Sequence, residues 1–251
     1  MSEETSFFSA KGLQKRFGQQ VVLEDISLSF ARGSVSGIMG PNGAGKSTCF
    51  NVLTGVYKPD RGRVTFDGED ITGLSSQRIA RRGISRSFQI MSLFDEFSAI
   101  ENVMVALPQV RGGLMRPLWD TRADNAVMDK AAAILNSVGL AGHEHTLASS
   151  LSYGQRRALE IGVALAPEPR IVFLDEPTQG LGSDGRVRLA ELVQSLREAY
   201  TLVIIEHDMD FLFRLADRIS VIHWGQVIAE GTPEELRSNQ WVRVSDLGKA
   251  G

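Results

Sequence analysis

The sequence predicts an α/β protein whose mostly parallel sheet is built around a phosphate-binding loop. The loop is the glycine-rich segment 40–48, which follows an apolar run at 35–39 and precedes a helix expected over 48–53. Two further apolar runs, 171–174 and 202–205, are continuous rather than alternating. Such runs are typical of parallel strands that are covered on both faces. We expect one core with subdomains, because 251 residues are many for one compact domain and few for two.

The segment 40–48 matches the pattern G-x-x-x-x-G-K-[ST] in the strand–loop–helix context that this pattern requires. Its glycines let successive backbone N–H groups converge on one point, where the start of the following helix also favours an anion. Lys46 can reach the β- and γ-phosphates, and Ser47 supplies a hydroxyl ligand for Mg²⁺. The alternative, a glycine-rich turn with a solvated Lys46, is disfavoured because both flanks fit. We therefore expect a nucleoside triphosphate to bind to Gly40, Pro41, Asn42, Gly43, Ala44, Gly45, Lys46, Ser47 and Thr48.

Titratable side chains follow the two continuous apolar runs. Asp175 and Glu176 end the first run, and His207 comes shortly after the second. Parallel sheets bind ligands at the carboxyl ends of their strands, so these side chains should share one edge with the phosphate loop. There Asp175 can hold Mg²⁺ through water, and Glu176 can polarise an attacking water, a contribution of roughly 10²–10⁴ in rate. His207 is a candidate γ-phosphate contact, although strand-end acids and a lone histidine can also be structural.

Further positions are candidates for the same site because of where they lie in the chain. Phe17, upstream of the phosphate loop, can stack on an adenine ring, although such a residue alone is more often part of a core. Gln89 is a candidate γ-phosphate sensor and Mg²⁺ ligand. Ser152 stands near the N-cap of a helix that opens at 151–156, whose free N–H groups would form a second anion site.

The remaining pattern outlines the subdomains. Residues 6–39 and 63–66 show the short apolar or alternating runs typical of strands, so a strand-rich portion is expected around the phosphate loop. Residues 92–150 are expected to be mostly helical, with an apolar stripe over 124–138 and an irregular segment at 108–120.

The arginines before Gln89 and the C-terminal part complete the predicted elements. One short cluster is expected to form a solvated helix face, namely Arg78, Arg81, Arg82 and Arg86. An amphipathic helix is expected over 189–196, and strands at 219–222 and 227–229 should complete the sheet. The polar tail beyond Gly231 is expected to end the fold.

Composition and charge narrow the class of protein. The chain has 27 Lys and Arg against 30 Asp and Glu, a net charge of −3, which lacks the basic excess of a nucleic-acid-binding protein. The acidic, polar N-terminus and the lack of a long apolar run argue against a signal peptide and a membrane span. Cys49 is the only cysteine, so no intramolecular disulfide can form and a cytoplasmic location is expected.

Together these motifs resemble the ATP-binding cassette (ABC) ATPase family, over nearly the whole chain from Phe17 to about residue 248. The segment Leu151-Ser152-Tyr153-Gly154-Gln155 resembles the signature sequence of this family, which other phosphate-loop families lack. The resemblance implies a RecA-like P-loop NTPase core with an antiparallel β subdomain and an α-helical subdomain at about 90–165, within a single domain over 6–248. It also implies an enzyme that binds ATP and Mg²⁺ and hydrolyses ATP.

The resemblance gives roles to the candidate residues. It implies that Phe17 stacks on adenine, that Val22 belongs to the nucleotide site and that Gln89 is the Q-loop glutamine. It also implies that Asp175 and Glu176 are the family's paired carboxylates, and that a switch histidine stands at His207.

Cassettes of this family dimerise head to tail. ATP held by one phosphate loop is then covered by the signature of the other subunit, here Ser152, Gly154 and Gln155. The second subunit would be another copy of this chain or a homologous chain. Closing the dimer buries both ATP molecules, and hydrolysis reopens it.

A finer resemblance is to the cassettes of branched-chain amino acid importers and of their urea and amide relatives. It rests on residues 84–90, 93–103, the insertion at 107–122, residues 206–210, 231–235 and 246–248. The chain departs from this subgroup at 179–184, Gln-Gly-Leu-Gly-Ser-Asp, where Gly-Leu-Asn-Pro is usual, and at Asp246, where tyrosine is frequent.

The resemblance implies an importer ATPase at the cytoplasmic face of the plasma membrane. It would bind membrane permease subunits through residues around 90–105 and work with a periplasmic or extracellular substrate-binding protein. Leu93, Phe94, Phe97 and Trp119 could offer an apolar surface to such a partner or pack in the subdomain core. One alternative is a soluble ABC-family ATPase that acts on ribosomes or DNA; another is an ATP-gated adaptor that does not hydrolyse ATP.

Overall fold

The computed structural model describes residues 6–87, 93–111 and 124–239, and its strands form a 10-stranded sheet. The order of the strands across the sheet is β5-β4-β1-β2-β10-β9-β3-β8-β7-β6. The described strands are β1 (Phe8–Phe17), β2 (Gln20–Phe30), β3 (Val35–Met39), β4 (Arg61–Phe66), β5 (Glu69–Asp70), β6 (Ile84–Arg86), β7 (Ile171–Asp175), β8 (Thr201–Glu206), β9 (Arg218–His223) and β10 (Gln226–Gly231). The described helices are α1 (Lys46–Leu53), α2 (Ser76–Ala80), α3 (Ala99–Met104), α4 (Pro108–Arg111), α6 (Asn125–Ser137), α7 (Tyr153–Leu165), α8 (Ser183–Leu196), α9 (Met209–Leu215) and α10 (Pro233–Ser238), with a 3₁₀ turn at Ala148–Ser150.

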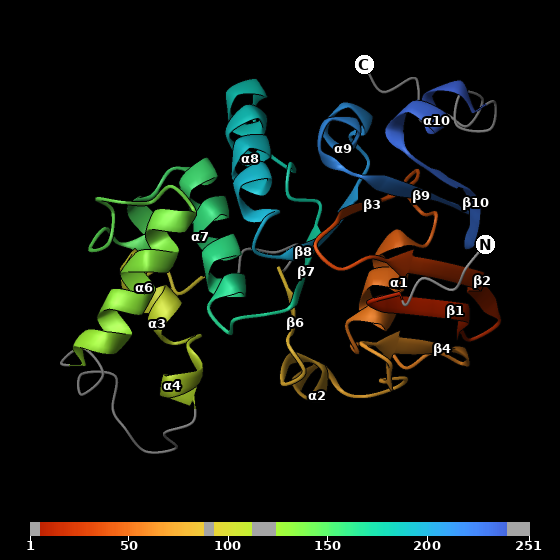
Figure 1. Ribbon diagram of the computed structural model, residues 1–251, viewed down its shortest axis with the longest axis horizontal. Coiled ribbons are helices and arrows are strands. Elements are labelled where there is room, and N and C mark those ends of the chain that lie inside the picture. The colour runs from red at the N-terminus through yellow and green to blue at the C-terminus, as the bar shows by residue number, and fades with distance from the viewer. Residues whose placement is uncertain (1–5, 88–92, 112–123, 240–251) are drawn as a thin grey trace.

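The sheet has an antiparallel part formed by β1, β2, β4 and β5. Strand β10 joins it to the rest of the sheet, because it pairs parallel with β2 and antiparallel with β9. Phe8 of β1 pairs with Phe30 of β2, and both side chains are buried. Phe173 of β7 lies edge-on to Phe8, with ring centroids 5.3 Å apart, and Phe50 of α1 lies 6.2 Å from Phe173. This aromatic cluster packs β1, β2 and α1 against the side of β7 that carries Phe173. Figure 1 shows α1 beside the antiparallel strands.

The parallel part of the sheet has β3 between β8 and β9, followed outward from β8 by β7 and β6. Every residue of β3, β7 and β8 is buried, which explains their continuous apolar runs. Successive side chains point to opposite faces. Ile171 and Phe173 therefore pack with α1, whereas Val172 and Leu174 pack on the helical side. Each such buried side chain stabilises the fold by roughly 1.5–3 kcal/mol.

The helices α3, α4, α6 and α7 gather at one end of the molecule, away from the antiparallel strands (Figure 1). Helix α7 contacts α3, α6 and α8, so it lies between this group and the sheet. The predicted apolar stripe is present on α6, where Val127, Ala131 and Leu135 are buried. No helix within the described ranges is both long and apolar enough to cross a membrane.

One predicted helix face is wrong. Arg78, Arg81 and Arg82 are exposed, as expected, but only Arg78 lies in α2, because that helix ends at Ala80. Arg86 lies in β6 and is half-buried. Its Nη1 donates hydrogen bonds to Asn51 Oδ1 and Thr54 Oγ1, both at 3.1 Å. The partners of Arg86 come from α1 and its end, more than 30 residues away in sequence. A local charge cluster could not indicate them.

Two boundaries also differ from the prediction. Helix α1 begins at Lys46 rather than Thr48, because the loop turns into the helix directly after Gly45. The tail beyond Gly231 does not end the fold, because α10 follows, with reciprocal capping between Thr232 and Glu235. Of the predicted irregular segment at 108–120, residues 108–111 form α4, and the rest lies outside the described residues.

Candidate nucleotide-binding site

The phosphate loop joins β3 to α1. It packs against β2 and against the turn between β9 and β10. At Gly45 φ is 101°, and a Cβ atom there would lie 2.9 Å from the carbonyl oxygen of Val22, so the position requires glycine. The amide of Gly225 donates to the carbonyl of Ala44 at 3.0 Å, and the amide of Glu24 donates to the carbonyl of Gly225 at 2.9 Å. These contacts fix the loop on the sheet.

The same turn carries an exposed aromatic residue that sequence reasoning missed. Trp224 is 83% exposed, and its ring stacks on His223 with centroids 5.4 Å apart. Its φ of 49° is rare for a bulky residue and is stabilised by the anchored Gly225 that follows it. The signal in the sequence is the glycine at 225 between two short apolar runs, which indicates a turn.

Lys46 lies buried inside the loop that precedes it. Its Nζ donates hydrogen bonds to the carbonyls of Gly40 at 2.8 Å and Pro41 at 3.0 Å. Burial lowers the pKa of Lys46, an effect opposed by the negative charges of Glu176, Asp175 and Glu206. The ammonium therefore stands among carboxylates at the centre of the loop, where it can meet an anionic ligand.

A cavity of about 480 Å³ opens beside the loop. Its walls come from β2, from the phosphate loop with the first turn of α1, and from the segments that follow β7 and β8. The lining residues are Val22, Asn42, Gly43, Gly45, Lys46, Ser47, Thr48, Glu176, Gln179 and His207. The structure thus brings most of the predicted loop to the same space as Glu176 and His207, which lie about 130 and 160 residues later.

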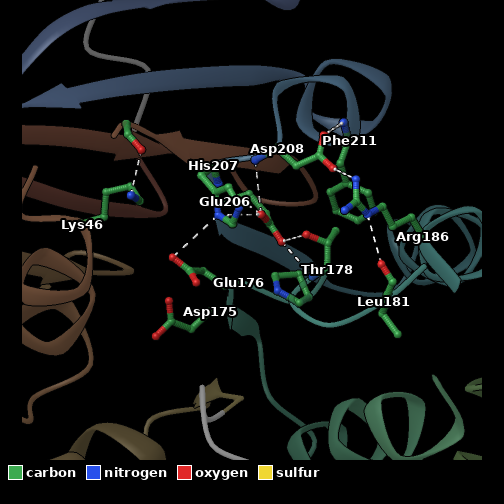
Figure 2. A network of polar contacts seen from close by, with 12 residues as sticks. Lys46, Asp175, Glu176, Thr178, Leu181, Arg186, Glu206, His207, Asp208 and Phe211 are labelled. Atoms are coloured by element: carbon green, nitrogen blue, oxygen red, sulfur yellow. Dashed lines mark hydrogen bonds and ion pairs between the residues drawn. The ribbon is translucent and has the colours of Figure 1, made fainter. Parts of the chain in front are cut away.

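The carboxylates at the end of β7 differ in environment (Figure 2). Asp175 is 5% exposed, and burial raises its pKa to about 6, with the charge of Glu176 acting in the same direction. Glu176 lines the cavity, and its Oε1 lies 3.9 Å from Nδ1 of His207. The amide of Glu176 donates to the carbonyl of Ile205 on β8 at 2.8 Å. Asp175 and Glu176 therefore present one shielded and one accessible carboxylate at the same edge.

The residues at this edge fit a divalent cation with oxygen ligands. Asp175 Oδ1 is buried and has no hydrogen-bond partner among the described residues. Leaving such an oxygen unsatisfied is costly, and Mg²⁺ prefers carboxylate and hydroxyl oxygens. Ser47 is exposed and lines the cavity, so a hydroxyl is available there, whereas Asp175 is not among the lining residues.

Glu206 is a functional candidate that the sequence did not single out. It is fully buried, and its Oε1 accepts hydrogen bonds from the amide and hydroxyl of Thr178 at 2.8 and 2.5 Å. Its Oε2 accepts from the amides of His207 and Asp208 at 3.1 and 3.4 Å. Figure 2 shows this carboxylate between the two loops. The signal was a charged residue that ends an otherwise apolar buried strand, which requires partners.

A second connection joins the same two loops further from the cavity. Arg186 of α8 donates from Nη1 to Asp208 at 2.9 Å and from Nε to the carbonyl of Leu181 at 3.3 Å. Asp208 also caps α9 by accepting from the amide of Phe211 at 3.1 Å (Figure 2). The unusual segment 179–184 is therefore attached to the loop that carries His207.

The predicted nucleobase residues are only partly brought to the cavity. Val22 lines it, but Phe17 does not. Phe17 is 44% exposed at the β1–β2 turn, edge-on to Tyr57 with centroids 5.3 Å apart. The ammonium of Lys15 lies 5.6 Å from the Phe17 centroid. Gln89 lies outside the described residues.

The second predicted anion site is a helix N-terminus on the surface. Ser152 caps α7, with Gln155 accepting from its amide and hydroxyl at 2.9 Å each. Ser152 and Gly154 are exposed, and neither lines the cavity described above. The side-chain nitrogen Nε2 of Gln155 also makes a hydrogen bond of 2.9 Å with Nε2 of His143. Within one chain, the structure does not bring Ser152, Gly154 and Gln155 to the phosphate loop.

The fold and this edge define a class of protein, the nucleotide-binding ATPases in which a phosphate loop and strand-end acids share the carboxyl edge of a parallel sheet. Residues 23–179 match the family model described as "ABC transporter", and the chain belongs to this family. Membership shows an ATP-binding cassette that hydrolyses ATP.

Individual relatives agree with this assignment. The chain is 41% identical over 249 residues to the high-affinity branched-chain amino acid transport ATP-binding protein LivG of Salmonella typhimurium, covering 96% of this chain and 98% of LivG. The crystal structure of the ADP conformation of MJ1267, an ATP-binding cassette of an ABC transporter, superposes with a TM-score of 0.85 at 31% identity, covering 97% of this chain and 99% of that one. A dimeric post-hydrolysis structure of the cassette MJ0796, bound to ADP and Pi, gives a TM-score of 0.75 at 27% identity, covering 90% and 98%.

Proposed function

We propose that this chain is the ATP-hydrolysing subunit of an importer for branched-chain amino acids or for a related amino acid, urea or amide. The observation that carries the proposal is the 41% identity, over nearly both full lengths, to the ATP-binding subunit of a branched-chain amino acid transporter. The geometry is compatible with it, because Lys46, Glu176 and His207 line one cavity. An adaptor that only binds ATP would not require a carboxylate and a histidine at this position.

In this proposal the phosphates of ATP lie against the loop 40–48. Lys46 would turn its ammonium from the Gly40 and Pro41 carbonyls toward the β- and γ-phosphates. Ser47, Asp175 and Gln89 would hold Mg²⁺, which neutralises phosphate charge when it is bound. Glu176 would orient the attacking water, and His207 would contact the γ-phosphate.

The proposal includes a head-to-tail dimer. Ser152, Gly154 and Gln155 would cover the nucleotide held by a second cassette, either a copy of this chain or a homologue. Support comes from their place at the exposed start of α7, outside the cavity of their own chain. The similar cassette MJ0796 forms a dimer.

Membrane permease subunits would bind near residues 90–105, placing the chain peripherally at the cytoplasmic face of the membrane. Phe94 supports this location, because it is 55% exposed and packs on Phe97 with centroids 5.0 Å apart. Trp119, which was predicted to share such a surface, lies outside the described residues. A substrate-binding protein outside the membrane would deliver the cargo to the permease. An ATPase of ribosomes or DNA is not favoured by the relatives.

The test measures uptake of labelled amino acids into proteoliposomes that contain the affinity-purified complex. ATP is supplied on the side of the membrane where this chain lies. We expect permease subunits to copurify and labelled leucine, isoleucine or valine to accumulate only with ATP. Glu191→Gln on the exposed face of α8 serves as the active control, and Glu176→Gln as the inactive one. Copurification of ribosomal proteins or DNA without a permease would overturn the proposal, and selective uptake of urea or an amide would assign that cargo instead.

A further inference from the structure

A buried arginine on α7 reaches the main chain that carries Glu176. Arg157 is 3% exposed, and its Nη2 donates to the carbonyl of Glu176 at 2.6 Å and to that of Asp175 at 3.2 Å. Its Nε donates to the carbonyl of Pro177 at 3.1 Å. One planar guanidinium therefore holds three consecutive carbonyls, which a lysine ammonium cannot match in geometry.

The charge of Arg157 is balanced on its own helix. Glu160, one turn further along α7 and also buried, accepts from Nη1 of Arg157 at 2.6 Å. This ion pair lies within α7, whereas Nε and Nη2 of the guanidinium donate to the main chain at the end of β7 and after it. An arginine that served only to neutralise Glu160 would not need these three further hydrogen bonds.

Tyr153 provides a second contact from the same face of α7, one turn before Arg157. Its hydroxyl donates to the carbonyl of Gln179 at 2.9 Å, and Gln179 lines the cavity. From the other side, Glu206 accepts the amide and hydroxyl of Thr178. The segment 175–179 is thus held between α7 and the end of β8.

The conformation of Glu176 shows why such support is needed. Its φ is 43°, in the left-handed region that residues with a side chain seldom adopt. Such a conformation persists only where the surroundings fix it. Here the amide of Glu176 bonds to Ile205 and its carbonyl bonds to Arg157.

We propose that Arg157 is a positioning residue for ATP hydrolysis, which ties the main chain of Glu176 to α7. Because Ser152 and Gly154 stand at the start of the same helix, a displacement of α7 when a second cassette engages them is transmitted to Glu176 through Arg157 and Tyr153. The inference rests on the proposed function in two respects, the role of Glu176 in orienting water and the contact of a second cassette with Ser152 and Gly154.

The test uses the purified full chain and measures kcat, KM for ATP and the dissociation constant of ATP. Arg157→Lys keeps the charge beside Glu160 but loses the planar fork. We expect its kcat to fall by about 10- to 100-fold, as for a small misplacement of a catalytic group, with ATP affinity within about twofold of the parent. The matched control is Arg156→Lys on the same helix, whose side chain pairs with Asp95 instead, and its kcat should be unchanged.

A double-mutant cycle that combines Arg157→Lys with Glu176→Gln distinguishes a positioning role of Arg157 from a merely structural one. If Arg157 acts through Glu176, Arg157→Lys should lower kcat strongly in the parent and little in the Glu176→Gln background. An equal factor in both backgrounds, or a parent kcat that Arg157→Lys leaves unchanged, overturns the inference. If Arg157→Lys does not fold, Tyr153→Phe provides the same cycle with loss of one hydroxyl. An unchanged rate in Glu176→Gln alone would instead contradict the proposed function.

Discussion

The carboxylate of Glu206 accepts hydrogen bonds from both the amide and the hydroxyl of Thr178, at 2.8 and 2.5 Å. The amides of His207 and Asp208 donate to the same carboxylate. One buried group therefore joins the loop after β7, which carries Glu176, to the loop after β8, which carries His207. The relative position of these cavity-lining side chains depends on a residue that does not itself line the cavity.

Glu206→Gln should destabilise the protein. The amide group of glutamine replaces one acceptor oxygen with a donor, so either Thr178 or the His207 and Asp208 amides lose their acceptor. A buried unsatisfied group costs roughly 1–3 kcal/mol, and urea denaturation followed by circular dichroism measures the loss. Glu230→Gln, which removes a surface pair with Arg218, is the control and should cost less than about 1 kcal/mol. Equal losses in the two variants would contradict the role of Glu206.

Glu176→Gln should retain ATP binding while slowing turnover by roughly 10²–10⁴, because glutamine keeps the shape but cannot polarise the attacking water. ATP should then accumulate in a closed dimer, which size-exclusion chromatography with ATP and Mg²⁺ would detect. Glu191→Gln on the exposed face of α8 is the matched control and should behave like the parent. A normal rate in Glu176→Gln would remove this residue from the reaction.

Lys46→Ala should weaken ATP binding. The variant loses a charged donor to the phosphates as well as the hydrogen bonds to the Gly40 and Pro41 carbonyls that shape the loop. A charge-assisted hydrogen bond is worth about 1.5–3 kcal/mol, so we expect the dissociation constant to rise about 10- to 100-fold in calorimetric titration. Lys130→Ala, which breaks a surface pair with Glu168 on another part of the molecule, should leave affinity unchanged. Normal affinity in Lys46→Ala would contradict the phosphate-loop assignment.

Cys49 should be unreactive in the native protein. Its side chain on α1 is buried, and burial raises the pKa of the thiol to about 12, so the reactive thiolate is suppressed at pH 8. An aromatic disulfide reagent should therefore label the folded chain slowly and label one thiol per chain rapidly in guanidinium. Rapid labelling of the folded protein at pH 8 would show that α1 is not packed as described.

The phosphate loop and the central strands could be predicted because their signals are local. The glycines of 40–48 fix the turn, and the continuous apolar runs of β7 and β8 follow from burial on both faces. The apolar stripe of α6 likewise depends only on helical period. Even α10 had a local signal, the Thr232 and Glu235 capping pair after Gly231.

The connections between segments could not be predicted in this way. Arg157 bonds to carbonyls 18–20 residues away in sequence, and Glu206 bonds to Thr178, 28 residues away. No local sequence pattern indicates these partners. The prediction for Arg86 was wrong for the same reason, because its guanidinium donates hydrogen bonds to Asn51 and Thr54, which are distant in sequence. The sequence therefore indicates which groups line the cavity better than it indicates which groups hold them in place.

The exposed Trp224 provides a fluorescent side chain next to the phosphate loop. Gly225, the next residue, is hydrogen-bonded to Ala44 of the loop, so the indole follows that loop while remaining in solvent. The chain has two other tryptophans, Trp119 and Trp241, and replacing both with phenylalanine leaves Trp224 as the sole emitter. Intrinsic emission from such a variant would then report on this turn, one residue from the hydrogen bond to the loop, without an attached dye.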